Sequence, residues 1–511
     1  MMAMLRVNVL SASVSAPDRG GGGPRSSKLR VLVRAGPARS RKHVRALPLA
    51  RPLLNRRHHG PTLHLRRSGA SGGAPMTHGR WASMRDAVRG LLGNDALMRV
   101  AASSSWLLGD RLVRAALGFF IGALVARHLG PAAFGQYSYA LTFVAFFQAV
   151  AVLGADSIVV RDIARDPQSA PVVLGSILRL RCLASLICWL AAVALAAWLD
   201  PGAGDGVIMV AIVGAIMLFQ AGDTVDLWFQ SQTQSRRTVV AKLSAYLLTA
   251  GFKVILVLVN APLLAFAAAV LLDYAAAALA LAVAYRRFPT AQDWSYDGDV
   301  ASRLLRDSWP FLLSALSITI YMRIDQIMLK SLQGSYDVGI FAAALPLSQI
   351  WQMIPMTLAI SFAPHVARQK LAGDVAYHQA LALVFRLFTL LSLAAALATA
   401  LAAPWLLPAI YGERYAASVP VLQIHVFTNV FIAMAVAQGL WIANEQRGDL
   451  LLIQTLAGAL VALIGNWWAI PRYGPLGAAA VAVVAHLTSS LLVNRVAAPG
   501  LFRMQLGLAP R

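Results

Sequence analysis

From about Trp106 to its C-terminus, the chain is a series of apolar segments, each long enough to cross a lipid bilayer. A hydrocarbon core about 30 Å thick requires roughly 20 apolar residues of helix. About twelve segments qualify, near residues 104–126, 133–154, 172–199, 207–229, 238–260, 262–285, 308–331, 338–362, 380–402, 418–442, 450–470 and 475–497. Backbone N–H and C=O groups exposed to lipid find no hydrogen-bond partners, so only helices and closed barrels span a membrane. The segments lack the polar–apolar alternation of barrel strands. The sequence therefore predicts an all-α polytopic membrane protein.

The composition agrees with a chain that lies almost wholly in the bilayer. Hydrophobic residues make up 58% of the sequence and charged residues only 13%, whereas soluble proteins average about 25% charged residues. Residues 1–83 contain one acidic residue, Asp18, among many arginines, and they supply most of the net charge of +23. Because the charge is concentrated there, it does not indicate a nucleic-acid surface, and we expect no nucleic-acid partner.

Residues 1–83 are rich in Arg, Gly, Ser and Pro and contain no long apolar run. Three interpretations remain open. The segment is a disordered basic extension, or an organellar transit peptide, or an artefact of a start site placed upstream of Met76 or Met84. We favour the artefact, because Met84 opens a short amphipathic segment just before the first apolar one.

The loops predict the orientation in the membrane. If the N-terminus is cytoplasmic and the segments alternate, the outer loops hold only four basic residues, Arg127, Lys330, Arg414 and Arg472. The other loop lysines and arginines then face the cytoplasm, as the positive-inside rule requires. This pattern predicts an inner-membrane protein with both termini in the cytoplasm. Every outer loop is short, so we expect no large catalytic domain outside the membrane.

The first six segments resemble the last six. The matching landmarks are the pairs Gly135/Gly339, Trp228/Trp441 and Pro262/Pro475, which lie 204, 213 and 213 residues apart. Six segments followed by six more in the same orientation form a parallel repeat, whose halves are related by an axis along the membrane normal. We predict an N-lobe at 84–285, a cytoplasmic loop at 286–307 and a C-lobe at 308–511, with a working cleft between the lobes.

Charged residues inside the apolar segments each cost at least about 2.5–3.5 kcal/mol to insert, so they are expected to face a wet cavity or a partner. Basic residues outnumber acidic ones there, which favours an anionic substrate. Candidate substrate-binding residues are Arg111, Arg114, Lys253, Arg323 and Arg386, and candidates for ion coupling or structural charge pairing are Asp273 and Asp325.

The first and fifth segments carry their charges on defined faces. Arg111 and Arg114 are three residues apart and share a helix face, and Asp110 can pair with Arg114 one turn away. Two interpretations stay open: a site for an anionic headgroup, or a structural ion pair with side chains that snorkel. Lys253 is the deepest member of a polar stripe that is expected to face the cavity or another helix, and its members are Lys242, Tyr246, Thr249 and Lys253.

The seventh segment carries Arg323 and Asp325, which are two residues apart and therefore point in nearly opposite directions. We expect Arg323 to face the substrate, with Gln326 and Lys330 on its side of the helix. Asp325 would then face a neighbouring helix or a site for a coupling ion.

Other charges leave several interpretations open. Asp273 lies among alanines, and three interpretations of it are open: a protonated acid, a partner of Lys253, or part of a proton path. Arg179, Arg181 and Arg386 lie near segment ends, where snorkelling to the headgroups is the simplest interpretation.

Motifs for catalysis are missing. His425 and Asn429 share a helix face, and we interpret them as partners in a structural hydrogen bond. The Asp297-Gly298-Asp299 triplet lies in a short loop and is interpreted as a solvated turn. Since no Walker A, HExxH or catalytic-triad pattern is present, we expect no enzymatic activity, cofactor or metal site.

Four stretches in order, 126–137, 321–329, 338–341 and 411–415, are similar to the Wzx-type polysaccharide biosynthesis proteins. These are lipid-linked oligosaccharide flippases of the multidrug/oligosaccharidyl-lipid/polysaccharide (MOP) exporter superfamily. The resemblance covers roughly 100–497 and implies a MATE-like fold, with two six-helix lobes around a central cavity that opens to one side at a time.

The resemblance also implies a substrate, an oligosaccharide repeat unit on undecaprenyl diphosphate that is turned across the bacterial inner membrane. Surface polysaccharides such as O-antigen, capsule or exopolysaccharide are then the product, and a polymerase and a chain-length regulator are possible partners. Alternatives are another transporter of the superfamily, either a lipid II-type flippase or a drug/cation antiporter, and a membrane-embedded polysaccharide polymerase. The polymerase would need a large outer loop, which the sequence lacks.

Overall fold

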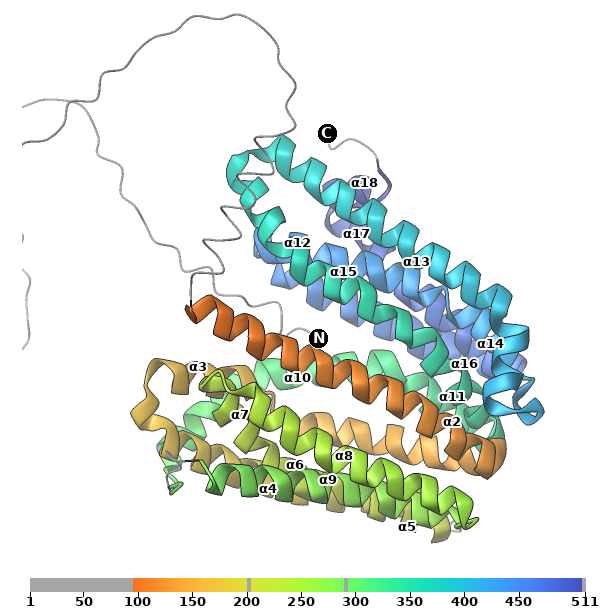
Figure 1. Ribbon diagram of the computed structural model, residues 1–511. Helices are drawn as coiled ribbons and strands as arrows, with labels where there is room; N and C mark the ends of the chain where they lie inside the picture. The colour runs from red at the N-terminus through yellow and green to blue at the C-terminus, as the bar shows by residue number, and fades with distance from the viewer. Residues whose placement is uncertain (1–94, 200–203, 289–292, 508–511) are drawn as a thin grey trace, which may run out of the picture. The chain divides into compact units, whose positions relative to one another are not determined.

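The computed structural model describes residues 95–199, 204–288 and 293–507 (Figure 1). These residues are almost entirely helical and include no strand. The predicted extension at 1–83 lies outside the described residues. We keep the name N-lobe for α2 to α9 and the name C-lobe for α10 to α18.

The N-lobe helices are α2 (Asp95–Ala151), α3 (Asp156–Arg165), η2 (Pro167–Ser169), α4 (Ala170–Leu199), α5 (Gly204–Gly214), α6 (Ile216–Gln220), η3 (Ala221–Asp223), α7 (Thr224–Ser231), α8 (Ser235–Leu258) and α9 (Leu263–Arg286). The C-lobe helices are α10 (Gly298–Leu332), α11 (Ser335–Gln349), η4 (Ile350–Gln352), α12 (Met353–Ala372), α13 (Asp374–Tyr411), η5 (Glu413–Tyr415), α14 (Ser418–His425), α15 (Thr428–Glu445), α16 (Gly448–Leu487), the π-helical turn η6 (Thr488–Leu492), α17 (Val493–Ala497) and α18 (Pro499–Gln505). The chain is all-α, as predicted.

Ten helical segments in the described part of the chain are long and apolar enough to cross a membrane. Two of them, Gly109–Arg165 and Gly448–Ala497, are far longer than one crossing requires. Each contains a glycine with a non-helical backbone, Gly130 (φ 75°) and Gly474 (φ 53°). Figure 1 shows α2 running to one end of the bundle and returning from it. Each long segment therefore supplies two crossings, which accounts for the twelve predicted.

The backbone repeats at the offsets found in the sequence. Gly130 (φ 75°, ψ 168°) and Gly334 (φ 97°, ψ −176°) lie 204 residues apart and have nearly the same conformation. A positive φ of this kind is open mainly to glycine, which explains the residue type at both turns. Thr233 (φ 55°) and Gln446 (φ 54°) form a second matching pair, 213 residues apart.

The lobes meet chiefly at the end where Gly130 lies, which we call the Gly130 end. There α2 packs against α11, and a smaller contact joins α2 to α13 and η5. A Cβ atom at Gly135 would lie 1.8 Å from the Ser335 carbonyl oxygen, and one at Gly339 would lie 1.9 Å from the Pro131 carbonyl oxygen. Pro131 and Ser335 are themselves 204 residues apart. The two halves of the repeat therefore make the same contact reciprocally.

The helix α10 contacts both lobes. At its start the Ser295 backbone N–H donates to the Pro171 carbonyl oxygen (3.1 Å), and Leu304 is buried in an N-lobe core. Near its end Leu329 belongs to the core formed with α11. The helix begins at Gly298, ten residues before the predicted segment, because the Asp297 carboxylate caps it by accepting from the backbone N–H groups of Asp299 and Val300. The Asp-Gly-Asp triplet is exposed to solvent, as expected, but it forms a helix start and not a turn.

Candidate functional site

A cluster of charged and polar side chains joins α2, α8 and α9 inside the N-lobe. Its first member is Arg114, whose Nε donates to the Asp110 carboxylate at 2.7 Å. The guanidinium lies 5.0 Å from the centre of the Tyr246 ring on α8, a distance at which a cation is attracted to the ring face. The Tyr246 hydroxyl donates back to the Arg114 carbonyl oxygen at 3.4 Å. The Arg114 guanidinium is therefore held by Asp110 and the Tyr246 ring.

The same face of α8 continues to Thr249, Lys253 and the α9 residue Asp273. The buried Thr249 hydroxyl donates to the Asp273 carboxylate at 3.0 Å. Lys253 is half-buried and lies within electrostatic range of Asp273, although the two form no ion pair within 4.0 Å. Thus the structure places Arg114, Lys253 and Asp273 in one lobe, with Asp273 hydrogen-bonded to Thr249 and not paired with Lys253. The three interpretations of Asp273 stay open.

One nitrogen of Arg114 has no hydrogen-bond partner in the part of the chain that the structure describes. Its Nη2 is buried and unpartnered, while Nε is taken by Asp110. A buried donor without an acceptor costs about 1–3 kcal/mol, more when it is charged. Guanidinium groups bind carboxylate and phosphate oxygens through paired N–H groups. This free edge of Arg114 is the strongest feature of the cluster for binding an anionic group.

The other predicted substrate-binding residues lie elsewhere. Arg111 is exposed and makes an interaction of its own. Arg323 is exposed on α10, but its expected companion Gln326 is buried and accepts a hydrogen bond from Thr142 of α2 at 2.9 Å. Arg386 lies on α13 beside the Gly507 backbone near the C-terminus. None of these three arginines makes a described contact with Arg114.

A second group of ion pairs was missed by the sequence reasoning. Arg181 is only 4% exposed, and its guanidinium contacts the Asp156 carboxylate. Lys242 bridges Asp223 (2.8 Å) and Asp226 (3.1 Å). Arg181 therefore does not snorkel to the headgroups, which corrects the expectation. The partners are far apart in sequence, so no local pattern would have found them.

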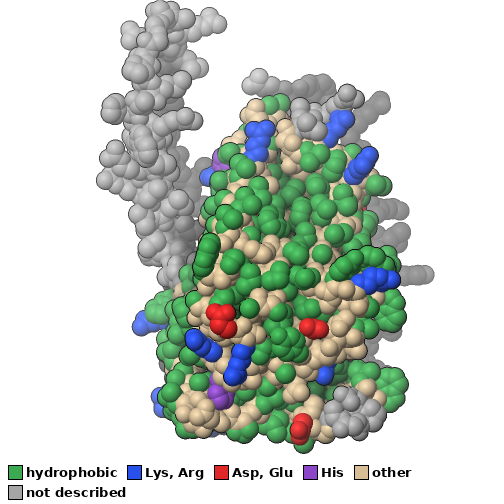
Figure 2. All heavy atoms as spheres, turned by 90° about the vertical axis from the view of Figure 1, so that its right-hand side faces the viewer, with side chains coloured by type: hydrophobic (Ala, Val, Ile, Leu, Met, Phe, Trp, Pro, Cys, Tyr) green, Lys and Arg blue, Asp and Glu red, His purple; other side chains and the backbone are tan. Residues whose placement is uncertain are grey.

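The end of the bundle at the right of Figure 1 carries no concentration of charge on the face that Figure 2 shows. Hydrophobic side chains dominate this face, and Lys, Arg, Asp and Glu side chains are scattered over it. Among the described residues no group of three His, Cys, Asp or Glu side chains lies close enough to hold a metal ion. The Arg114 cluster is the candidate site because it combines a buried unpartnered guanidinium nitrogen with ordered neighbours.

A family model described as "Polysaccharide biosynthesis protein" matches residues 100–369, more than half of the chain. The chain belongs to this family. The match runs from α2 into α12 and therefore includes the whole Arg114 cluster. No curated protein matches the sequence.

Solved structures that share the fold include transporters of the MOP superfamily and a lipid II flippase. An inward-facing multidrug resistance MATE family transporter has a TM-score of 0.60 and 16% identity, with 77% of this chain and 96% of that one covered. The lipid II flippase MurJ in an inward closed conformation has a TM-score of 0.55 and 15% identity, with 80% and 90% covered. A MOP superfamily transporter from Pyrococcus furiosus has a TM-score of 0.54 and 16% identity, with 80% and 96% covered.

These findings confirm the resemblance and the fold class predicted from the sequence. The polysaccharide biosynthesis family member is an all-α, multi-pass membrane protein with a MATE-like and MurJ-like architecture. Its structural neighbours include a MATE family transporter and a lipid II flippase, and this likeness shows the fold.

Proposed function

We propose that this polysaccharide biosynthesis family member flips undecaprenyl-diphosphate-linked oligosaccharide repeat units across the bacterial inner membrane. The repeat units would then be used for O-antigen, capsule or exopolysaccharide synthesis. The observation that carries the proposal is the buried, unpartnered Nη2 of Arg114, which is set within a membrane-spanning helix. A second cation, Lys253, lies farther along α8, the helix whose Tyr246 contacts Arg114. A diphosphate is an anionic group that both side chains bind well.

The contacts of the cluster suggest how the headgroup is held. Asp110 and the Tyr246 ring orient Arg114 before substrate arrives, so that little side-chain freedom is lost on binding. Asp273 compensates the charge of Lys253 while the site is empty of substrate. The diphosphate would take up the free edge of Arg114, and the lipid chain would remain in the bilayer. Arg323 is the candidate for a contribution from the other lobe.

The arrangement of the lobes supports alternating access. The main contact of the N-lobe with α11, α13 and η5 is made through α2 at the Gly130 end, while α10 joins the lobes along its length. In the predicted orientation, with both termini cytoplasmic, the Gly130 end faces away from the cytoplasm. The lobes would be closed on that side, and rocking about α10 would open it.

The test is complementation of a bacterium that lacks its own repeat-unit flippase, with surface polysaccharide as the readout. The full chain is expected to restore it. Arg114→Gln should lower the flipped amount about tenfold or more, because a charge-assisted contact contributes about 1.5–3 kcal/mol. Arg114→Lys should be intermediate, since it keeps the charge and loses the second donor edge.

Matched controls separate the site from general damage. Arg472→Gln removes an exposed guanidinium that stacks on Trp468, and it should leave rescue unchanged at equal protein level. Full rescue by Arg114→Gln would reject the site but keep the function. Rescue of a strain depleted of its lipid II flippase, or a gain of drug resistance, in place of rescue of polysaccharide would reject the proposed substrate in favour of the corresponding alternative.

A further inference from the structure

Two short segments from different lobes contact each other at the Gly130 end. One is the turn of α2 at 126–130, and the other is the turn from α13 into η5 at 412–415. The Tyr415 hydroxyl donates to the Ala126 carbonyl oxygen at 2.7 Å, and further contacts join α2 to α13 and η5. Tyr415 is completely buried. The two turns therefore pack directly on each other across the boundary between the lobes.

Each turn carries an arginine that lies against the other lobe. A Cβ atom at Gly412 would lie 3.8 Å from Nε of Arg127, and one at Gly130 would lie 3.8 Å from Nη1 of Arg414. Both glycines have a positive φ, 90° and 75°. Since glycine has no side chain, each arginine can lie over the backbone turn of the opposite lobe. The two side chains thus cross the boundary in opposite directions.

These two arginines have no bonding partner. Arg127 and Arg414 are exposed, and neither forms an ion pair or a hydrogen bond with a residue that the structure describes. The other two basic residues predicted for the outer loops already have partners. Lys330 donates to a serine hydroxyl of α11 at 2.8 Å, and Arg472 donates to the Trp468 carbonyl oxygen and stacks on the same ring. The unpartnered guanidinium groups are therefore the two that cross between the lobes.

The acidic residue next to Arg414 does not neutralise this pair. Glu413 is exposed and forms no ion pair within 4.0 Å among the described residues. Like charges on facing segments repel each other, weakly where solvent screens them. A phosphate group that contacts both would replace this repulsion by two attractions, because a guanidinium holds phosphate oxygens through paired N–H groups. The arrangement suits an anion that binds both lobes at once.

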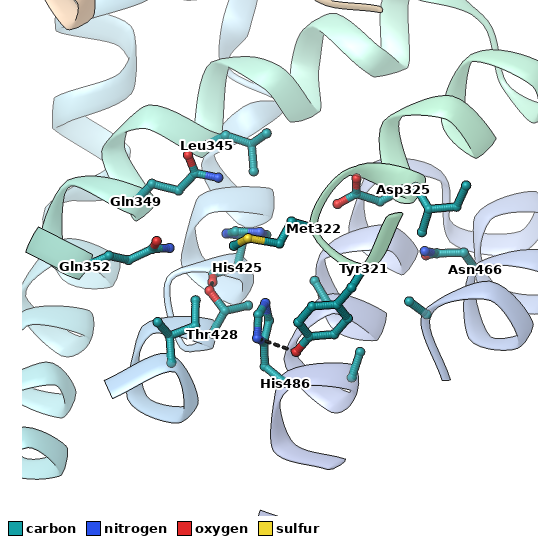
Figure 3. A pocket seen from close by; sticks show the side chains of 15 residues that line it. Tyr321, Met322, Asp325, Leu345, Gln349, Gln352, His425, Thr428, Asn466 and His486 are labelled. Carbon is teal, nitrogen blue, oxygen red and sulfur yellow. Dashed lines mark hydrogen bonds between the residues drawn. The ribbon is translucent and has the colours of Figure 1, made fainter. Parts of the chain in front are cut away.

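The two arginines belong to separately packed units. Arg127 lies on α2, which packs on α4 and α8 in the N-lobe. Arg414 belongs to the C-lobe, where the later half of α10 is tied to α16 (Figure 3). There Asp325 is 9% exposed, and the Tyr321 hydroxyl lies 2.5 Å from Nδ1 of His486. When the lobes part at the Gly130 end, the two guanidinium groups move apart, so one anion bridges them only in the closed state.

We propose that Arg127 and Arg414 form an anion-binding site on the outer face, where the diphosphate of an exported lipid binds across the lobes and holds the transporter closed. A diphosphate offers oxygens on two phosphorus atoms and can occupy both guanidinium groups. A ligand that binds the closed state more tightly shifts the population toward it. Product left in the outer leaflet would therefore slow further flipping. The identity of the lipid rests on the proposed function, whereas binding of a phosphate group across the lobes does not.

The experiment measures how fast a cysteine at the closed end reacts. Phe134, which is 8% exposed beside Tyr415, is replaced by cysteine in a Cys182→Ala background of the full-length chain in detergent. A water-soluble maleimide reaches this cysteine when the end opens. Inorganic pyrophosphate, compared with sodium chloride of equal ionic strength, is expected to slow labelling about fivefold or more, the lower end of typical coupling between a ligand and a conformational change.

Variants in the same background locate the effect. Arg127→Gln and Arg414→Gln should each abolish the slowing by pyrophosphate, because one lobe then loses its hold on the anion. Arg472→Gln removes an outer guanidinium that has its own partners, and the slowing should persist. Arg414→Glu places a carboxylate opposite Arg127 and should slow labelling without any pyrophosphate.

A lipid arm identifies the source of the phosphate. In nanodiscs of phosphatidylcholine, undecaprenyl diphosphate is expected to slow labelling through Arg127, and phosphatidylglycerol at equal mole fraction is not. Equal slowing by phosphatidylglycerol would overturn the assignment in favour of a general phospholipid site. Labelling that pyrophosphate leaves unchanged, or slows equally in both glutamine variants, would overturn the site itself. Since no transport is measured, a failure here is distinct from a failure of complementation.

Discussion

Replacing Gly339 by alanine places a methyl group where the two lobes touch. The new Cβ atom would lie 1.9 Å from the Pro131 carbonyl oxygen and 2.8 Å from its carbonyl carbon, whereas ordinary contacts begin near 3.4 Å. Both partners are backbone, so no side chain can rotate away. The helices α2 and α11 must therefore separate by more than about 1 Å, and overpacking of this kind costs about 1–3 kcal/mol.

The cost applies to the closed Gly130 end rather than to the fold of either lobe, because Gly339 and Pro131 belong to different lobes. A bias of about 1–3 kcal/mol shifts the ratio of open to closed molecules by about 5- to 150-fold. A cysteine introduced at Phe134, which is 8% exposed and packs near Tyr415, should react faster with a water-soluble maleimide by that factor. The labelling is done in a Cys182→Ala background.

The controls come from the same chain. Gly122→Ala makes the same substitution on α2 at a point where the added Cβ atom has no atom within 4 Å, and it should leave labelling unchanged. The native Cys188, which is buried in an N-lobe core, should stay unlabelled in Gly339→Ala. Equal labelling of the wild type and Gly339→Ala at position 134, or labelling of Cys188, would refute the reasoning.

Two other contacts give measurable predictions. Tyr415→Phe removes the hydroxyl that donates to the Ala126 carbonyl oxygen at 2.7 Å. This hydrogen bond is worth about 1 kcal/mol, so its loss should raise the labelling rate of the cysteine at position 134 about fivefold. Burial raises the pKa of Tyr415, so this effect should be the same at acidic and mildly alkaline pH; a difference between the two would contradict the assignment. Lys242→Met leaves Asp223 and Asp226 without their ion-pair partner and should lower the melting temperature. The expected loss in the free energy of unfolding is about 1–2 kcal/mol after allowance for partial exposure. A melting temperature equal to that of the wild type would show that the bridge contributes nothing.

Local features of this chain were predictable from the sequence because each depends on neighbouring residues. The membrane segments follow from continuous apolar stretches, and the Asp110–Arg114 pair follows from a spacing of four on a helix. His425 and Asn429, which we interpreted as structural, each hydrogen-bond to Ser348 and not to each other.

Features that depend on the packing of distant segments were not predictable. Asp156 lies 25 residues from Arg181, and only the way α4 packs beside the start of α3 brings them into contact. The start of α10 was missed for a different reason: Asp297 reads as a turn residue, and its capping role appears only once the following residues are helical. The placement of Arg386 beside Gly507 likewise required the fold of the C-terminal segment.

The reciprocal contact at Gly135 and Gly339 has a consequence for the origin of the two-lobed chain. Each half carries a glycine and a backbone carbonyl, and the carbonyl of each half packs closely on the glycine of the other. The contact surface of one half is therefore complementary to the same surface of the other half, as in a two-fold homodimer. In such a dimer a single codon change at this position would introduce two clashes at once. Fusion into one polypeptide separates the two positions, so that each can now change alone, and in this sequence both are still glycine.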